Sequence, residues 1–364
     1  MAGDRWLGRL HVTPDANDRF RIDCPTPRGD SDRILLAHGE GGRLTRQLIR
    51  RELAPAFAHP ALQALGDAAV LPELDRPLVV TTDSYVVTPL FFPGGDIGSL
   101  AVHGTVNDLA VAGGEPLYLC LGLILEEGLP TETLRRIIAS VSRAAETCGV
   151  AIVAGDTKVV PRGAADAVFV HTTGVGRLRP NISLDPRTIQ VGDRVLVSGT
   201  IGDHGMAILS AREELAFETP IASDSAPVSE FVSALFRAGV RVRWMRDPTR
   251  GGVAAALHEL ADAADITIEI DDRALPVAPS VHGACELLGL DPIFVANEGK
   301  VVAVVEDGDA DRALAEWRRC EGGSHAAVIG RIVTTGRAEV LIRTPLGGLR
   351  VLDEPSGAPL PRIC

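Results

Sequence analysis

Apolar residues along the chain follow two periods, and these predict alternating strands and helices from Ile34 onward. The segment LVVTTDSYVV is rich in β-branched residues, which is typical of a strand. After Pro130, apolar side chains recur every three or four residues as far as Cys148, which predicts an amphipathic helix. The strands predicted in this half lie at 78–87, 118–125, 151–153 and 167–170.

The second half repeats this mixture of elements. Glycine-rich turns at 199–202 and 251–252 each precede a helical pattern of apolar residues. Five more strands are predicted at 194–198, 267–270, 300–305, 328–333 and 338–342, and helices at 44–53, 253–264 and 309–320. Strands and helices mixed in two successive halves predict an α+β fold (α/β mixed) of two domains.

The same pattern gives the domain boundaries. The first residues are polar with several prolines, and the last are marked by Gly347, Gly348, Pro355, Pro359 and Pro361, so neither end reads as a packed element. The predicted parts are an N-terminal arm at 1–33, an N-terminal domain at 34–180, a C-terminal domain at 181–345 and a mobile tail at 346–364.

The net charge, the lengths of the apolar runs and the cysteine spacing each exclude a class of protein. The chain has 364 residues and a net charge of −12, which argues against a nucleic-acid or anionic-membrane surface. No apolar run approaches the roughly 18 residues that a membrane-spanning helix needs, and no signal-peptide core follows the start. The 6 cysteines show neither a CxxC pair nor zinc-like spacing. We therefore expect a cytoplasmic protein with free thiols.

Four aspartates stand out because each interrupts or ends an apolar segment or precedes a glycine turn. They are Asp83, Asp108, Asp156 and Asp247. An unpaired carboxylate beside a buried strand is unfavourable, and several converging carboxylates repel one another unless a cation lies between them. Mg²⁺ with a nucleotide phosphate supplies such a cation. The alternative is that each aspartate caps a helix or a turn.

Glycine clusters and nearby basic residues add a second signal for phosphate. Gly39, Gly41 and Gly42 precede the predicted helix at 44–53, where backbone amides could approach phosphate oxygens closely. Lys158 could pair with phosphate charge or serve as a surface ion-pair partner. The pattern is neither a P-loop nor a Rossmann turn, which disfavours those two classes. The clusters could equally be ordinary turns.

Two further residues could act as a base. Glu298 lies in ANEGK, directly before a buried strand, where it could take a proton or close a turn. His38, beside the glycines, is the better functional candidate among the histidines. The chain ends in Pro-Arg-Ile-Cys, so Cys364 carries a thiol at a free end. That cysteine could be an ordinary terminus or a thiol that is presented to another site.

In this order, these segments resemble the superfamily of aminoimidazole ribonucleotide synthetases, selenophosphate synthetases and thiamine-monophosphate kinases. Within it the sequence is most similar to the HypE family of hydrogenase maturation factors. The resemblance covers about residues 34–364, and the PRIC ending separates this family from its relatives. The matching segments are LAHGEGGRLTRQLI, TTDSYVVTPLFFPGGDIGSLAVHGTVNDLAVAGGEPLYL, AGDTKVV, GDRVLVSGTIGDHGMAIL, MRDPTRGGVAAALHELA, ANEGK and PRIC.

The resemblance implies a synthetase-like pair of domains, with the N-terminal domains of a homodimer pairing into a shared β-barrel. It implies that ATP and Mg²⁺ bind in a cleft under the glycine loop at 38–42. The family's Mg·ATP positions fall on Asp83, Asn107, Asp108 and Asp156, with Lys158 near the phosphates and Asp247 at a relative's metal-binding acid.

The resemblance also implies the activity. In this family the carbamoyltransferase HypF carbamoylates the terminal thiol, here Cys364, and ATP drives dehydration of the thiocarboxamide to a thiocyanate. Glu298 and then His38 are the candidate bases. The cyanide then passes to iron on the HypC–HypD complex. Two alternatives stay open: another ATP-dependent enzyme of the superfamily, such as a selenophosphate synthetase or small-molecule kinase, and a non-catalytic nucleotide-binding docking protein.

Overall fold

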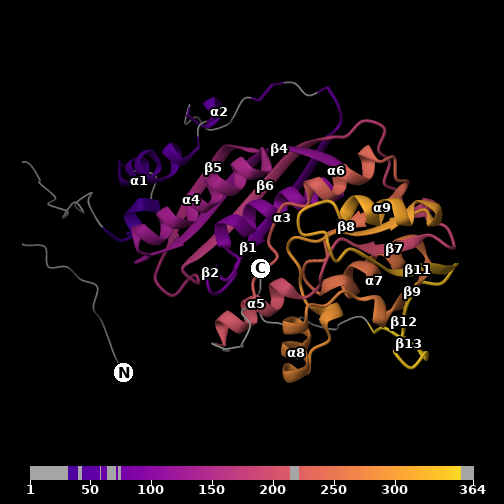
Figure 1. The fold of residues 1–364 in the computed structure, drawn as a ribbon. Helices are drawn as coiled ribbons and strands as arrows, with labels where there is room; N and C mark the ends of the chain where they lie inside the picture. The colour runs from indigo at the N-terminus through magenta and orange to yellow at the C-terminus, as the bar shows by residue number, and fades with distance from the viewer. Residues whose placement is uncertain are drawn as a thin grey trace, which may run out of the picture.

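The computed structural model describes residues 32–39, 43–57, 59–63, 71–72, 75–213 and 221–353. Two β-sheets organise this part of the chain, one in each half (Figure 1). The first has the strand order β1-β6-β4-β5, and the second β13-β12-β9-β11-β7-β10-β8. A short pair, β2-β3, lies between β1 and the first long helix.

The four-stranded sheet has one face covered by helices. Its strands are β1 (Leu78–Tyr85), β4 (Gly114–Glu126), β5 (Ala151–Val160) and β6 (Val168–Leu178), with β2 (Phe91–Phe92) and β3 (Gly95–Asp96) forming the short pair. The helices α3 (Ile97–Val111) and α4 (Thr131–Cys148) pack together, and α3 also contacts β1, β4 and β6. Alternate residues of β4 from Leu119 to Leu125 are buried. The opposite face keeps the exposed side chains of Leu78 and Val80.

Helices α4 and α3 show when the spacing of apolar residues predicts a helix and when it does not. Helix α4 confirms the predicted amphipathic segment and ends at Gly149, whose φ of 68° is the left-handed conformation that stops a helix. Helix α3 was not predicted. Most of its residues are buried, on every side, because it lies between the first sheet and the second domain, so it has no polar stripe. Its start is fixed by Asp96, which accepts hydrogen bonds from the amides of Gly98 and Ser99.

The second half is a seven-stranded sheet with helices packed on it. Its strands are β7 (Arg194–Val197), β8 (Val242–Arg246), β9 (Ile266–Asp271), β10 (Val302–Val305), β11 (Ala327–Thr335), β12 (Glu339–Arg343) and β13 (Leu349–Val351). Its helices are α5 (Asp203–Arg212), α6 (Ser229–Arg237), α7 (Gly252–Ala264), α8 (Pro279–Leu288) and α9 (Ala310–Trp317). The predicted strands and helices here are confirmed, while β8, β13, α6 and α8 were not predicted.

The N-terminal part of the described chain is a series of short helices beside β5. These are η1 (Leu36–Gly39), α1 (Arg43–Leu48), the π-helix η2 (Ile49–Leu53), η3 (Ala54–Ala56) and α2 (Pro60–Gln63). The helix predicted at 44–53 is therefore present, with its last turn widened into η2. Both η1 and α2 contact β5.

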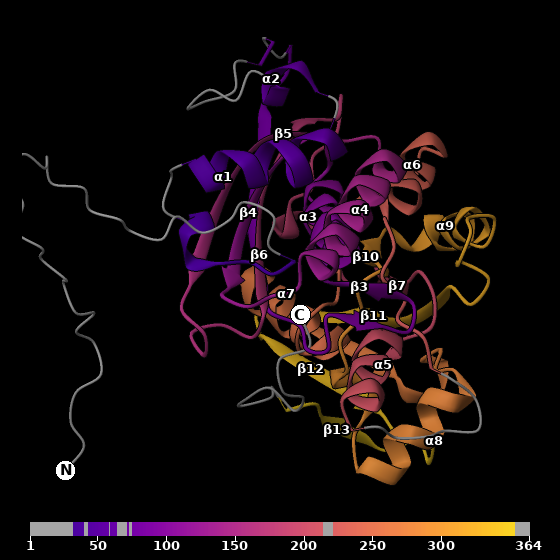
Figure 2. The same cartoon turned by 90° about the vertical axis from the view of Figure 1, so that its left-hand side faces the viewer.

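Apolar contacts join the two halves. Ala110 and Val111 at the end of α3 pack with residues of α6 and α9. Met206 of α5 and Val281 of α8 belong to the buried cluster of the first half. Figure 2, turned by 90° from Figure 1, shows α3 and α4 beside the first sheet with α5 and α8 on the second-half side. The candidate site residues lie where the two halves meet.

The two-domain mixed fold is as predicted. The boundaries at 33/34, 180/181 and 345/346 stay predictions, and most of the predicted arm and tail lies outside the described residues. Within the part of the chain that the structure describes, no helix is long and apolar enough to cross a membrane.

Candidate functional site

The first two acidic side chains of the site come from β1 and α3. Alternation along β1 directs Thr81, Asp83 and Tyr85 toward the helix-covered side of the sheet. The Thr81 hydroxyl donates to Asp108 Oδ2 at 2.8 Å, and the Tyr85 hydroxyl donates to Asp83 Oδ2 at 3.3 Å. Tyr85 can approach α3 because Gly104 has no side chain: a Cβ there would lie 2.2 Å from the phenol oxygen. Asp83 and Asp108 therefore share one corner.

Two further carboxyl groups reach the same place from the second domain. Asp247 follows β8 directly, and Glu298 lies four residues before β10. These strands are antiparallel neighbours in which Val302 pairs with Arg246, so the end of one and the start of the other meet at one edge. The exposed fractions of Asp247 and Glu298 are 5% and 2%. We call Asp83, Asp108, Asp247 and Glu298 the acidic cluster.

The pKa values of Asp108, Asp247 and Glu298 indicate repulsion between neighbouring carboxyl groups. Burial and then the charge of Asp83 raise the pKa of Asp108 to about 6. Burial and then Asp108 raise the pKa of Asp247 to about 7. Burial, followed by Asp247, Asp224, Asp83 and Asp108, raises the pKa of Glu298 well above its ordinary value. A cation between these groups would relieve the repulsion.

The donor set suits Mg²⁺ that arrives with a nucleotide better than a resident ion. Among the described residues, no three His, Cys, Asp or Glu side chains are placed so that they could hold a metal ion between them. Mg²⁺ in nucleotide sites takes only one or two carboxylates and completes its shell with phosphate oxygens and water. One or two of Asp83, Asp108 and Asp247 fit that role, because each is an oxygen donor and the repulsion between these carboxyls exceeds the effect of the nearby Arg246.

The cluster predicts how the ligand-free protein responds to pH. Because folding raises the pKa of Asp108 and Asp247 above 3.8, protonation of these groups favours the folded state. That stabilisation is complete below their unfolded pKa and is lost as the pH rises to about 6 and about 7. We expect the melting temperature without divalent cations to fall over this range, and to fall less for Asp247→Asn. Equal slopes for the two proteins in thermal denaturation would contradict the shared-charge assignment.

Asn107 was predicted to contact the nucleotide, and this stays a prediction. In the structure its side chain is buried and connects the two domains. Its Nδ2 donates to the carbonyls of Ala226 at 3.0 Å and Glu298 at 3.1 Å, and its Oδ1 accepts from the Val228 amide at 2.8 Å. Both N–H groups are therefore used by protein backbone in this conformation.

The remaining predicted residues lie elsewhere. Asp156 and Lys158 are exposed on β5, the edge strand opposite β1, where they pair with each other at 3.1 Å. Three strand spacings of about 4.8 Å separate the two edges. His38 lies in η1 beside β5, and its Nδ1 accepts from the Leu35 amide at 3.0 Å. Burial lowers the pKa of His38, which favours its neutral form.

The sheet therefore places these residues on two faces. The cross-strand partners run from Ser84 through His171 and Gly122 to Asp156, so Asp156 shares the face of Ser84, not of Asp83. Gly39 ends η1 on the same side of the molecule as β5, whereas Gly41, Gly42 and Cys364 lie outside the described residues.

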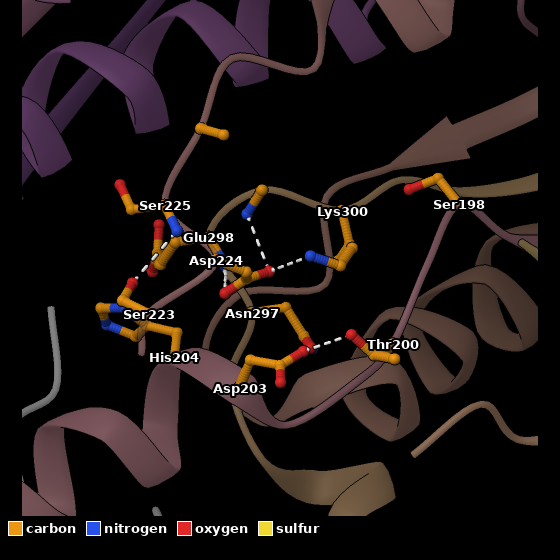
Figure 3. A network of polar contacts seen from close by, with 12 residues as sticks. Ser198, Thr200, Asp203, His204, Ser223, Asp224, Ser225, Asn297, Glu298 and Lys300 are labelled. Carbon is orange, nitrogen blue, oxygen red and sulfur yellow. Dashed lines mark hydrogen bonds and ion pairs between the residues drawn. The ribbon is translucent and has the colours of Figure 1, made fainter. Parts of the chain in front are cut away.

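One group of polar residues behind Glu298 was not predicted. Figure 3 shows Asp224 between the Glu298 backbone and Lys300. The Lys300 ammonium lies 2.9 Å from Asp224 Oδ2 in a pair that is almost fully buried. Asp224 sits in the irregular segment ASDSAP, which has no periodic pattern. The available signal was Lys300, because a lysine directly before a buried strand needs a partner.

Comparison with known proteins gives consistent results along the chain. Residues 65–178 match the N-terminal domain model of AIR synthase related proteins, and residues 190–343 match the C-terminal domain model. The carbamoyl dehydratase HypE of Cupriavidus necator is 50% identical over 336 residues, which cover 92% of this chain and 95% of that protein.

Two solved structures are similar over most of the chain. A crystal structure of the hydrogenase maturation protein HypE in complex with ATP has a TM-score of 0.87 and 46% identity, covering 91% of this chain and 99% of that one. A crystal structure of a HypE–HypF complex has a TM-score of 0.74 and 46% identity, covering 86% and 100%. The acidic cluster therefore lies in a fold for which an ATP complex has been solved.

Proposed function

Because the chain belongs to the HypE family of carbamoyl dehydratases, which act in hydrogenase maturation, we propose that it converts an S-carbamoylated Cys364 to a thiocyanate with ATP. The observation that carries this proposal is the acidic cluster, in which buried carboxyls from both domains converge and raise one another's pKa, even though Arg246 is near Asp108 and Asp247. Such a site suits a nucleotide phosphate with its metal and disfavours a plain docking role.

The reaction divides into two steps. The amide oxygen of the thiocarboxamide attacks the γ-phosphorus of ATP, so an O–P bond forms and ADP leaves. The nitrogen then loses two protons while the C–O bond breaks, which releases phosphate and leaves S–C≡N. An amide oxygen is a poor leaving group, and phosphorylation makes it a good one. Glu298 is our first candidate for the base that removes a nitrogen proton, because its raised pKa favours holding a proton.

Mg²⁺ is the metal that suits phosphoryl transfer, and one or two of the carboxylates of Asp83, Asp108 and Asp247 would hold it together with the phosphates. When bound, it supplies positive charge beside the phosphates. Ionised acidic residues without it would repel the nucleotide, so the chain's own carboxyls make nucleotide binding depend on the metal.

Turnover tests the proposal against a docking protein. ATP should be hydrolysed only when the tail has first been carbamoylated, with one ADP formed for each thiocyanate. A nucleotide-binding scaffold would bind ATP and leave it intact under both conditions. A small-molecule kinase would instead consume ATP with an uncarbamoylated tail when its substrate is supplied.

Asp83→Asn is expected to weaken Mg·ATP binding by about 10- to 100-fold, because it removes one anionic oxygen that the metal would use. Isothermal titration calorimetry with Mg·ATP measures the change. Asp307→Asn is the control, since Asp307 is an exposed surface partner of Arg194. Unchanged affinity in the Asp83 variant would remove this residue from the metal site.

The partners follow from the same proposal. HypF would deliver the carbamoyl group to Cys364, and a relative of this chain has been crystallised with HypF. The cyanide would then pass to iron on a HypC–HypD complex for the active site of a [NiFe]-hydrogenase. We place these exchanges in the cytoplasm.

We also propose a homodimer in which the exposed sheet faces meet and the N-terminal domains form a shared β-barrel. Leu78 and Val80 expose 60% and 59% of their surface on that face, which is unusual for neighbouring apolar side chains of a sheet. Asp156 and Lys158 lie on the same face. In such a dimer they would lie at the interface, on the side of the sheet that faces away from the acidic cluster.

Val80→Glu is expected to give a monomer, because it buries a charge in the proposed interface. Sedimentation analysis measures the state, and ATP turnover should fall with it. Leu346→Glu is the control, because Leu346 is fully exposed on the β12–β13 turn of the other domain. If the Val80 variant forms a dimer with an unchanged dissociation constant, the interface lies elsewhere.

A further inference from the structure

Residues 221–228, which we call the interdomain strap, run between the two domains and contact both. On the N-terminal side, the Ser223 amide donates to the Pro93 carbonyl at 2.8 Å, and the Val228 amide donates to Asn107 Oδ1 at 2.8 Å. On the C-terminal side, Ser223 Oγ lies 2.8 Å from His204 Nδ1 (Figure 3). The strap is therefore fixed by polar contacts to both domains.

Asp224 is the residue of the strap that contacts the Glu298 segment. Its Oδ1 accepts from the Glu298 amide at 3.2 Å, and its Oδ2 accepts from the Gly299 amide at 3.2 Å and from Lys300 Nζ at 2.9 Å. Figure 3 shows these contacts converging on one carboxylate. Three successive residues are thus held by a single side chain.

The strap and the Glu298 segment approach each other closely at Gly299. A Cβ on Gly299 would lie 1.9 Å from the Asp224 carbonyl oxygen, so the two backbones touch directly. On the other side, Asn107 Nδ2 donates to the Glu298 carbonyl at 3.1 Å. The amide and the carbonyl of Glu298 are therefore held from opposite directions by Asp224 and Asn107.

Asp224 is suited to this role because it is ionised. Burial opposes its charge, but Lys300, His204 and the amide donors outweigh burial and hold the pKa of Asp224 below its ordinary value. Hydrogen bonds that backbone amides donate to a carboxylate are stronger than those to a neutral acceptor. Lys300 thus neutralises the charge of Asp224, while the hydrogen bonds from the Glu298 and Gly299 amides to Asp224 hold the main chain in place.

We propose that Asp224 is a positioning residue for the dehydration, and that it acts by fixing the Glu298 main chain so that the Glu298 carboxyl meets the tail. The inference rests on the proposed function of Glu298 as the base. The competing account is a buried ion pair that stabilises the second domain and has no bearing on the chemistry.

The variant that separates the two accounts is Asp224→Asn with Lys300→Met. The double change removes both charges, so no buried charge is left unpaired, while the amides lose the carboxylate. The rate constant for conversion of carbamoylated tail to thiocyanate, at saturating ATP, should fall about 10- to 100-fold, as expected for a misplaced catalytic group. The half-saturating ATP concentration should change little.

The matched control is Asp309→Asn. Asp309 is a buried carboxylate that also accepts a backbone amide, from Arg241 at 2.8 Å, and pairs with arginines beside α9. Its replacement should lower the melting temperature without lowering the conversion rate. A loss of rate in this control equal to that of the double variant would assign both effects to stability and overturn the proposal.

A double-mutant cycle supplies the decisive readout. If Asp224 acts only through Glu298, adding its double change to Glu298→Gln should cause no further loss of rate. A full additional loss, or a wild-type rate in the double variant, would overturn the inference. A wild-type protein that forms no thiocyanate would instead contradict the proposed function, and the inference with it.

Hydrogen exchange keeps the proposal testable if the double variant does not fold. In the wild-type protein, the amides of Glu298 and Gly299 should exchange as slowly as those of β10, because both donate to Asp224. Exchange at the rate of an open loop would contradict the positioning role.

Discussion

Cys364→Ala should abolish thiocyanate formation while Mg·ATP still binds. The thiol is the proposed attachment point of the carbamoyl group, and alanine offers no atom that could carry it. The proposed nucleotide site is the acidic cluster, which does not include this thiol, so we expect nucleotide affinity to be unchanged. Calorimetry with Mg·ATP and mass spectrometry of the C-terminal peptide measure the two properties on one preparation.

A second cysteine provides the control for this result. Cys320 is a free, half-buried thiol at the end of α9, where its Sγ lies 3.5 Å from the Glu316 carbonyl. Burial raises the pKa of the Cys320 thiol, which makes it a poor nucleophile at neutral pH. Cys320→Ala should therefore form thiocyanate normally. Product formation by the Cys364 variant would show that the group is carried elsewhere.

Glu298→Gln should lower the conversion rate by about 10²- to 10⁴-fold, the range expected when a general base is lost. ATP should still bind, because glutamine adds no negative charge to the proposed nucleotide site. The negative charge of Glu298 is unfavourable in the folded protein, since burial and Asp247 raise the pKa of Glu298. The variant should thus melt at a temperature equal to or above that of the wild type near pH 8.

Glu269→Gln separates this effect from a general loss of charge. Glu269 is a partly buried glutamate of the same domain that pairs with Arg343 at 3.0 Å, away from the acidic cluster. Its replacement should leave the conversion rate unchanged. If the Glu298 variant keeps the wild-type rate as well, the base is another residue, and His38 becomes the next one to replace.

The sequence predicted helix α4 and missed helix α3, and the burial of their faces explains the difference. Helix α4 has an apolar stripe and a glycine stop, and both were visible in the sequence. Helix α3 is apolar on all sides because it lies between two domains, so its residues show no period. Asp108 was consequently placed beside a strand or glycine turn and not in a helix.

The site was only partly predictable for a related reason. Asp83, Asp108 and Asp247 were chosen as single residues beside apolar segments, but their convergence depends on the contacts that α3 makes with β1 and with β8. Asp156 was chosen by the same rule and lies on the other face of the sheet. Asp224 had no local signal, because its role arises from contacts made across the domain interface.

Mass spectrometry of the C-terminal peptide tests the central claim most directly. The protein would be incubated with the carbamoyltransferase and carbamoyl phosphate, first without and then with Mg·ATP. We predict that the peptide ending in Cys364 gains the mass of one carbamoyl group and then, only with ATP, loses the mass of one water. A carbamoylated peptide that keeps its mass in the presence of Mg·ATP would contradict the account.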